Sequence, residues 1–145
     1  MSMKGMEDSQ VLSFNEQIIA EFRENEGRCG GRFEGNPMLL MTMTGARSGR
    51  QITNPLTCHH HGDDYIVMAS AGGHDRHPSW YYNIVANPEV TLEVGTEKFA
   101  ATAVVLEGDE RSEAFDAMCG AMPRFGDYQS SVEREIPIIA LRRTG

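Results

Sequence analysis

The feature of this sequence that most constrains its fold is a series of short apolar segments separated by turns that contain glycine. Two of these segments, "EVTLEV" and "KFAATAVVLE", are separated by Gly95 and Thr96, a spacing typical of a β-hairpin. Pro55 in another segment indicates an edge strand or a bulge, because proline cannot donate to a sheet ladder. We predict a mainly antiparallel sheet of about six strands, at residues 38–44, 51–61, 65–71, 89–94, 98–107 and 136–143.

Helices are predicted before and between these strands. The segment "SFNEQIIAEF" has the S-x-x-E form of a capping box followed by apolar residues at helical spacing. It predicts a helix from Ser13 to Asn25, closed by Gly27. Further helices are predicted at residues 80–87, from a cap at Asp109 onward, and after Pro123. This order of elements predicts a single α+β domain at residues 13–145, preceded by a flexible segment at residues 1–12.

The composition disfavours several classes of protein. With 13 basic and 21 acidic residues, the formal net charge is −8. This charge disfavours nucleic acid and anionic lipid as partners, because both bind basic surfaces. The longest apolar runs are far too short to span a membrane, and the first residues lack the apolar region of a signal peptide. Cys29, Cys58 and Cys119 are an odd number without C-x-x-C spacing, which indicates reduced thiols in a cytoplasmic protein.

The segment "TGARSGR", Thr44 to Arg50, has two interpretations. It is either a hairpin turn with solvated charges or a site for an anion such as phosphate. Glycines let backbone N–H groups form a concave nest, Ser48 adds a hydroxyl, and Arg47 adds charge-assisted hydrogen bonds. The segment is not a P-loop, since G-x-x-x-x-G-K-[ST] is absent and a strand follows rather than a helix. Within these residues alone, both interpretations stay open.

Two other motifs favour less specific interpretations, and a third stays open. His59 to His61 follow Cys58 on a strand whose side chains alternate between faces, so neither face supplies the three ligands that zinc requires. We therefore predict no metal site. No G-x-S-x-G elbow is present, which disfavours a covalent hydrolase. The segment "SAGGHDRHPSWYYN" leaves a strand and enters an aromatic helix, where Trp80 is either a core anchor or part of an anion-binding pocket.

Six segments occur together in one order: "FNEQIIAEFRENEG", "GGRFEGNPMLLMTMTGARSGR", "NPLT", "GDDYIVMASAGG", "HPSWYYNIVANPEVTLEVG" and "IPIIALRR". Together they resemble the deazaflavin-dependent nitroreductase family, actinobacterial and related enzymes that use the 8-hydroxy-5-deazaflavin coenzyme F420. The resemblance runs from Phe14 to Arg143, nearly the whole chain. It implies a split β-barrel of the type also found in FMN-binding relatives of pyridoxamine oxidase.

The resemblance also implies a binding site for the coenzyme. Its phosphate and acidic tail would bind to the turn residues Ala46, Arg47 and Ser48. Its deazaflavin and ribityl chain would lie along the strand Ile52, Thr53, Asn54, Pro55, Leu56 and Thr57. The pocket would be completed by Met68, Ala69, Ser70 and Ala71 from the next strand and by Ser79, Trp80, Tyr81, Tyr82 and Asn83 from the helix.

The chain departs from the family pattern at three places. Relatives usually have a basic residue where this chain has Ile52, and often a lysine where it has Ala71. Binding of the anionic tail should therefore be weaker, unless Arg50 or Arg76 compensates for the missing positive charges. Near the C terminus, relatives often place aromatic residues three apart, and the corresponding positions here are Met122, Phe125 and Tyr128. Phe125 and Tyr128 are expected to bound the substrate pocket.

The activity that the resemblance implies is reduction of an electron-poor, conjugated acceptor by reduced F420. The acceptor would be an activated enone or lactone, a quinone, or a nitroaromatic. Ser70, Thr57 and Tyr128 are the hydrogen-bond donors expected to stabilise charge that develops on it. A separate F420-reducing dehydrogenase would regenerate the coenzyme. Two alternatives stay open: an FMN-dependent reductase of the same barrel type, and a non-catalytic carrier of F420 or of an apolar ligand.

Overall fold

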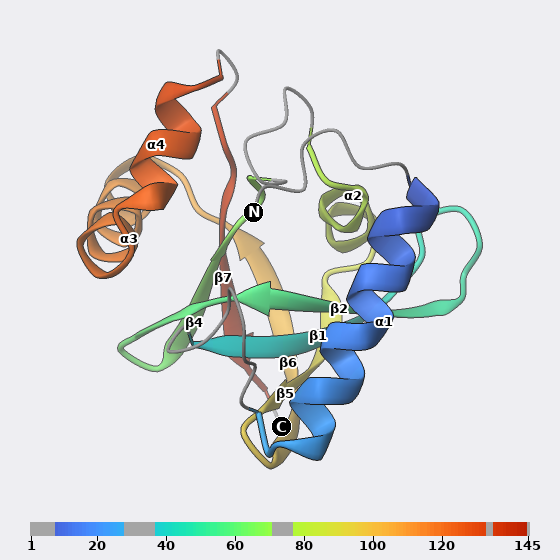
Figure 1. Ribbon diagram of the computed structural model, residues 1–145. Helices are drawn as coiled ribbons and strands as arrows, with labels where there is room; N and C mark the ends of the chain where they lie inside the picture. Colours follow the sequence, from blue (N-terminus) through green and yellow to red (C-terminus); the bar gives the residue numbers. More distant parts are fainter. Residues whose placement is uncertain (1–7, 28–36, 71–76, 133–134, 145) are drawn as a thin grey trace.

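The chain folds around one β-sheet flanked by helices (Figure 1). A computed structural model describes residues 8–27, 37–70, 77–132 and 135–144. The elements in chain order are α1 (Asp8–Glu24), β1 (Met38–Thr44), β2 (Gln51–Thr57), β3 (His59–His61), β4 (Asp64–Met68), α2 (Ser79–Ala86), β5 (Glu89–Val94), β6 (Glu97–Val105), α3 (Gly108–Ala121), α4 (Arg124–Ser130) and β7 (Ile138–Arg143).

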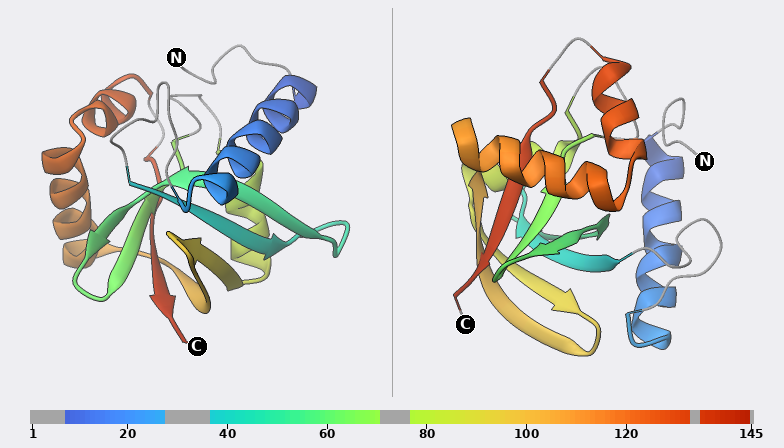
Figure 2. Two further views of the ribbon diagram at one scale, coloured as in Figure 1. Left: turned by 60° about the horizontal axis from the view of Figure 1, so that its bottom comes forward. Right: turned by 90° about the vertical axis from the view of Figure 1, so that its left-hand side faces the viewer.

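The sheet is strongly curled. Its strands lie in the order β2-β1-β5-β6-β7-β4-β3, and every neighbouring pair is antiparallel. β2 and β3 therefore lie at opposite edges, although Cys58 alone separates them in the chain. A flat sheet of this size would hold its edges roughly 29 Å apart, at about 4.8 Å per strand. Since one residue spans at most about 3.8 Å, the sheet must bend into the partial barrel seen in Figure 2.

The concave face of the sheet contains the main hydrophobic core. Strand residues alternate between faces, and the inward-facing side chains form one buried cluster that includes Leu39, Met41, Met43, Val67, Val90, Leu92, Phe99, Ala101, Ile139 and Leu141. α2 adds Trp80 and Ile84 to the same cluster. The start of α2 is therefore held rigidly against the inside of the barrel.

Helices cover two separate parts of the convex face (Figure 2). α1 packs Ile18 and Phe22 against Met38 and Leu40 of β1. α3 and α4 cover β4 and β7 through a larger buried cluster, formed by Ile66, Met68, Leu106, Ala114, Met118, Met122, Phe125, Ile136, Ile138 and Ala140. The two covered regions are called the α1 face and the α3–α4 face below.

The predicted α+β class, the predicted antiparallel sheet and the edge position of Pro55 are confirmed. The predicted strand at residues 51–61 is two strands, so the sheet has seven strands rather than six. The break falls at Cys58, whose N–H donates to Pro37 O at 3.0 Å. Burial raises the pKa of the Cys58 thiol to about 12, so this thiol is protonated and inert at neutral pH.

Two predicted helix starts are wrong. α1 begins at Asp8, so Ser13 lies inside the helix and does not cap it. Residues 8–12 contain neither glycine nor proline, and the helix therefore extends through part of the segment predicted to be flexible. Residues 1–7 lie outside the described residues. The N-cap of α3 is Glu107 rather than Asp109, which lies in the first turn.

Candidate functional site

The turn between β1 and β2 is a compact loop closed by its own backbone. Gly45 N–H donates to Arg50 O at 2.8 Å, and Gly49 N–H donates to Gly45 O at 3.0 Å. Gly49 has a φ of +70°, which residues with a side chain rarely adopt. A Cβ on Gly45 would lie 2.6 Å from Ser48 Oγ. The shape of the loop therefore requires glycine at position 49, and the present position of the Ser48 hydroxyl favours glycine at position 45.

This loop keeps two adjacent N–H groups open. Asn83 Oδ1 of α2 accepts the Ala46 N–H at 2.9 Å, and Ser48 Oγ accepts the Arg50 N–H at 3.2 Å. Two further N–H groups of the loop close the turn itself. Within the part of the chain that the structure describes, the N–H groups of Arg47 and Ser48 have no acceptor. Two neighbouring open amides are a common element of anion sites.

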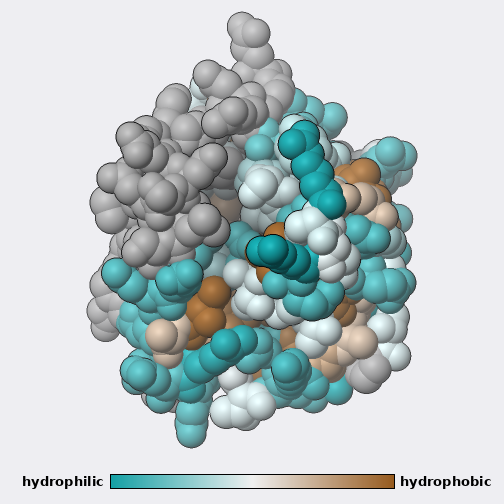
Figure 3. All heavy atoms as spheres, turned by 90° about the vertical axis from the view of Figure 1, so that its right-hand side faces the viewer, coloured by the Kyte–Doolittle hydropathy of each residue, from teal (hydrophilic) through white to brown (hydrophobic). Residues whose placement is uncertain are grey.

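The loop also carries two free positive charges. Arg47 and Arg50 are exposed, and no carboxylate among the described residues pairs with either guanidinium. Four other arginines do bind carboxylates: Arg23, Arg111, Arg142 and Arg143. On the side of the molecule that carries the loop, strongly hydrophilic side chains project between small hydrophobic patches (Figure 3). Positive charge is therefore concentrated at this turn in an otherwise acidic chain.

The free side of β2 offers unpaired backbone groups. Hydrogen-bonded and non-hydrogen-bonded pairs alternate along an antiparallel ladder, and the bond from Cys58 N–H to Pro37 O sets this alternation for the β1–β2 pair. The backbone groups of Thr53, Pro55 and Thr57 therefore point away from β1. No partner for them is found among the described residues. Proline is tolerated at such a position because no ladder donor is lost.

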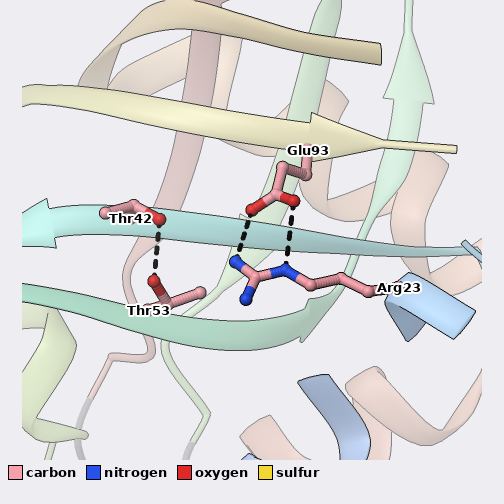
Figure 4. Close-up of polar contacts among 4 residues, drawn as sticks. All are labelled: Arg23, Thr42, Thr53 and Glu93. Carbon is pink, nitrogen blue, oxygen red and sulfur yellow. Dashed lines mark hydrogen bonds and ion pairs between the residues drawn. The ribbon is translucent and has the colours of Figure 1, made fainter. Parts of the chain in front are cut away.

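The side chains of β2 are neither fully buried nor fully exposed between Ile52 and Thr57. On the face toward α1, the Thr53 and Thr42 hydroxyls share a hydrogen bond of 2.8 Å (Figure 4). Thr57 Oγ1 donates to Met38 Sδ at 3.3 Å. Thioether sulfur is a weak acceptor, so the Thr57 hydroxyl can change partner at little cost.

The end of β4 is buried between the two cores. Met68 belongs to the α3–α4 cluster and Ala69 to the inner core. Ala69 N–H donates to Pro137 O at 3.0 Å. Ser70 is 7 % exposed and is the one of these three residues with a polar side chain. Ala71 lies outside the described residues.

The first residues of α2 lie against both the core and the β1–β2 turn. Trp80 is buried in the inner core, as expected of an anchor, and Tyr81 packs against the same cluster. Tyr82 is 52 % exposed, and Ser79 is also exposed. Asn83 accepts the N–H of the turn, as described above. The structure thus brings the two predicted coenzyme segments, the turn and the start of α2, into direct contact.

The predicted substrate residues on α4 form a separate group. Phe125 is buried in the α3–α4 cluster, and Tyr128 packs against that cluster. Their rings meet edge to face with centroids 5.6 Å apart. Figures 1 and 2 show α4 beside α3, apart from α2 and the β1–β2 turn. A ligand that contacts both groups must therefore reach past the end of β4.

The histidine run follows the expected alternation. His60 stacks on Tyr65 with ring centroids 4.5 Å apart, whereas the His59 and His61 rings lie 6.2 Å from each other. Among the residues that the structure describes, no three or more His, Cys, Asp or Glu side chains gather as a metal site would require. None of the described helices is both long and apolar enough to cross a membrane.

One residue that the sequence reasoning missed is Asn15 of α1. It is 9 % exposed, and no hydrogen bond of its side chain is found among the described residues. Asn15 lies three and seven residues before Ile18 and Phe22, and this spacing places all three on the sheet-facing side of the helix. A polar residue at an apolar position of a helical pattern was the available signal.

Comparison with known proteins gives one consistent family. A family profile described as F420H(2)-dependent quinone reductase matches residues 15–143. The F420H(2)-dependent quinone reductase Rv1261c of Mycobacterium tuberculosis is 36 % identical over 138 residues, which cover 92 % of this chain and 91 % of that protein.

Solved structures agree with this family and with the fold. The structure of an F420-H2 dependent reductase (FDR-A) superimposes with a TM-score of 0.69 at 37 % identity, covering 73 % of this chain and 94 % of that chain. A putative pyridoxamine 5'-phosphate oxidase from Listeria innocua superimposes with a TM-score of 0.50 at 10 % identity, covering 90 % and 93 % of the two chains. The second likeness concerns the fold alone, a split β-barrel.

Proposed function

Because the chain belongs to the F420H(2)-dependent quinone reductase family, we propose that it transfers a hydride from reduced F420 to a quinone or another electron-poor, conjugated acceptor. As a member of this family, the protein is an F420H2-dependent reductase with coenzyme F420 as its cofactor. The other proposed acceptors are activated enones or lactones and nitroaromatics. The observation that supports the site most strongly is the β1–β2 turn, with its open amides and unpaired arginines, next to the free side of β2.

The turn fits the anionic part of the coenzyme. The N–H groups of Arg47 and Ser48 and the guanidinium groups of Arg47 and Arg50 would bind the phosphate and the tail carboxylates through charge-assisted hydrogen bonds. Ser48 Oγ already accepts the Arg50 N–H but keeps its own proton to donate. The Ala46 N–H is taken up by Asn83 Oδ1, so these two residues hold the loop in place, while the Asn83 Nδ2–H groups stay available as donors. Arg50 would compensate for the cations absent at Ile52 and Ala71; Arg76, the other candidate for this role, lies outside the described residues.

β2 fits the neutral part of the coenzyme. From Gln51 to Thr57 the strand extends roughly 20 Å, at about 3.4 Å per residue. That length accommodates a ribityl chain followed by a three-ring system. The unpaired backbone groups of Thr53, Pro55 and Thr57 offer donors and acceptors for the ribityl hydroxyls and the ring heteroatoms. The end of β4, with Ser70, would contact the ring from the other direction.

The protein orients the reactants and stabilises charge. When bound, reduced F420 supplies the hydride in a two-electron step. We propose that Thr57, Ser70 and Tyr128 donate hydrogen bonds to the acceptor oxygen or nitro group as negative charge develops there. The Thr57 hydroxyl can leave its weak sulfur acceptor for this purpose. Phe125 and Tyr128 would bound the acceptor on the side of α4.

Titration of the purified protein with oxidised F420 and with FMN, followed by fluorescence, tests this function. Addition of a quinone to the protein loaded with reduced F420 then tests turnover. We expect tight binding of F420, weaker binding of FMN, and oxidation of the reduced coenzyme by the quinone. Binding of FMN alone would support the flavin-dependent alternative. Binding of F420 without turnover on quinone, enone or nitroaromatic acceptors would support a carrier. A turnover assay in the cell would require an F420-reducing dehydrogenase as partner.

A further inference from the structure

Asn15 presents a buried polar group that the described part of the fold does not satisfy. The residue is 9 % exposed, and helical spacing places it on the same side of α1 as Ile18 and Phe22, which pack against β1. The residues that the structure describes provide no hydrogen bond to this amide. Buried amides in native proteins nearly always have a partner, and those that lack one usually await a ligand or an ordered water. Asn15 is therefore a candidate binding residue.

The path of α1 places Asn15 over β2. The C-terminal end of the helix lies at β5, where Arg23 binds Glu93 at 2.9 Å (Figure 4). Phe22 packs against Met38 of β1, the next strand. Asn15 lies eight residues before Arg23, or about 12 Å along the helix axis. β5 and β2 are two strand spacings apart, or about 10 Å. α1 crosses these strands in Figure 1 and contacts β2. The two lengths agree, so Asn15 lies at the level of β2.

Other groups at this place on β2 are also incompletely satisfied. The backbone N–H and C=O of Thr57 and the C=O of Pro55 point to the free side of the strand. Among the residues that the structure describes, the Thr57 hydroxyl has the Met38 sulfur as its one acceptor. Met38 pairs with Thr57 at the end of the β1–β2 ladder that is farthest from the turn. Phe22 of α1 belongs to the same cluster as Met38, so α1 lies beside this end of β2. If the phosphate binds at that turn, the ring of the coenzyme lies beside α1.

We propose that Asn15 binds the pyrimidinedione edge of the deazaflavin, with Nδ2–H donating to a ring carbonyl and Oδ1 accepting the ring N–H. An amide carries a donor and an acceptor side by side, which complements a carbonyl next to an N–H. This proposal rests on the proposed function, and it adds a residue of α1 to a site otherwise formed by the turn, the strands β2 and β4, and the helices α2 and α4. Asn15 is a binding residue for the coenzyme ring, independent of the phosphate site.

The test is the variant Asn15→Leu, with Asn25→Leu as the matched control. Asn25 is exposed, and its Nδ2 bonds only to Glu21 O within the same helix end. Dissociation constants are measured for F420 and for the phosphate-free 8-hydroxy-5-deazariboflavin, together with the melting temperature of the ligand-free protein. Because leucine removes an unsatisfied amide, we expect the melting temperature of Asn15→Leu to stay constant or rise. We expect both dissociation constants to rise about tenfold or more, by the same factor.

Opposite changes in stability and affinity distinguish a ligand-binding amide from a structural one. Unchanged affinity with a lower melting temperature would mean that Asn15 serves the fold, through an ordered water, and would overturn the proposal. Weaker F420 binding with unchanged binding of the phosphate-free analogue would overturn it as well, since the amide would then serve the tail. If leucine prevents folding, Asn15→Ala must give the same loss of both affinities. Failure of the wild-type protein to bind either compound would instead refute the proposed function itself.

Discussion

The two covered parts of the convex face differ in how completely their polar groups are satisfied. On the α3–α4 face, the buried cluster is apolar throughout, and at its margin Arg142 binds both Asp64 and Glu110. On the α1 face, the cluster contains four buried apolar residues among those whose burial the structure describes, and Asn15 on the same helix lacks a partner among the described residues. The neighbouring β1–β2 turn holds two arginines, Arg47 and Arg50, that make no ion pair with the described part of the chain.

This difference assigns different roles to the two faces. Polar groups without partners reduce stability. A protein therefore retains them where a ligand supplies the missing hydrogen-bond or ion-pair partners. The α3–α4 face has the features of a structural support, because its apolar and charged groups are matched within the protein. The α1 face and the β1–β2 turn have those of a binding region. Substitutions on the α3–α4 face, apart from those of the proposed acceptor residues Phe125 and Tyr128, should therefore change stability, and substitutions at the turn should change F420 affinity.

The largest expected effect is on the α3–α4 face. Met118 is fully buried at the centre of that cluster. Met118→Ala should lower the free energy of unfolding by about 2–5 kcal/mol, because the truncation leaves a cavity in a close-packed core. Urea denaturation measures this loss. The F420 affinity of the folded variant should equal that of the wild type, and a large loss of affinity at unchanged stability would invalidate the division between the faces.

The next largest effect is at the β1–β2 turn. Arg47→Ala should weaken F420 binding by about 1.5–3 kcal/mol, the usual scale for hydrogen bonds to charged groups. Stability should hardly change, since the side chain is exposed and makes no ion pair with the described residues. Arg142→Ala on the α3–α4 face is the matched control: it removes two exposed ion pairs, each worth about 1 kcal/mol or less, and should leave F420 affinity unchanged. If Arg47→Ala and wild type bind F420 equally well at low salt, the turn is a hairpin with solvated charges and not an anion site.

A smaller effect than those of Met118→Ala and Arg47→Ala, and one on stability, concerns the junction where β2 meets β3. Burial raises the pKa of the Cys58 thiol from 9.0 to about 12, so the thiol stays neutral in the fold and ionises above pH 9 in the unfolded chain. Its contribution to stability is complete below pH 9 and is lost progressively as the pH rises toward 12. At pH 10 the loss should be about 1.4 kcal/mol. Cys58→Val should remove this part of the pH dependence of the free energy of unfolding. If wild type and Cys58→Val lose stability equally between pH 9 and pH 12, the junction is open to solvent and the prediction is wrong.

Local signals explain which parts of the fold could be predicted from the sequence. The β5–β6 hairpin and the strand β1 follow from apolar segments next to glycine turns, and both have the predicted positions. The break at Cys58 could not be predicted, because it depends on how far the whole sheet curls. The start of α1 was misplaced because the capping-box pattern at Ser13 also fits the interior of a helix.

The candidate site, whose role stays a prediction, could be outlined from the sequence but not described in detail. The turn residues were identified from their glycines and arginines, which are local features. The bond between Ala46 and Asn83 joins residues 37 positions apart, and no local pattern reveals it. The burial of Asn15 likewise depends on where α1 crosses the sheet. Residue roles that depend on contacts between distant segments became visible only in the folded chain.

The most direct test of the central claim is a single-turnover experiment. Protein saturated with reduced F420 is mixed rapidly with a quinone, and the return of oxidised F420 is followed by its absorbance. We expect oxidation to be much faster than for free reduced F420 with the same quinone. Ser70→Ala and Tyr128→Phe should slow it about ten- to thousandfold while F420 affinity stays nearly constant, because these donors act in the transition state. A wild-type rate no greater than the rate without protein would contradict the claim that this chain is an F420-dependent quinone reductase.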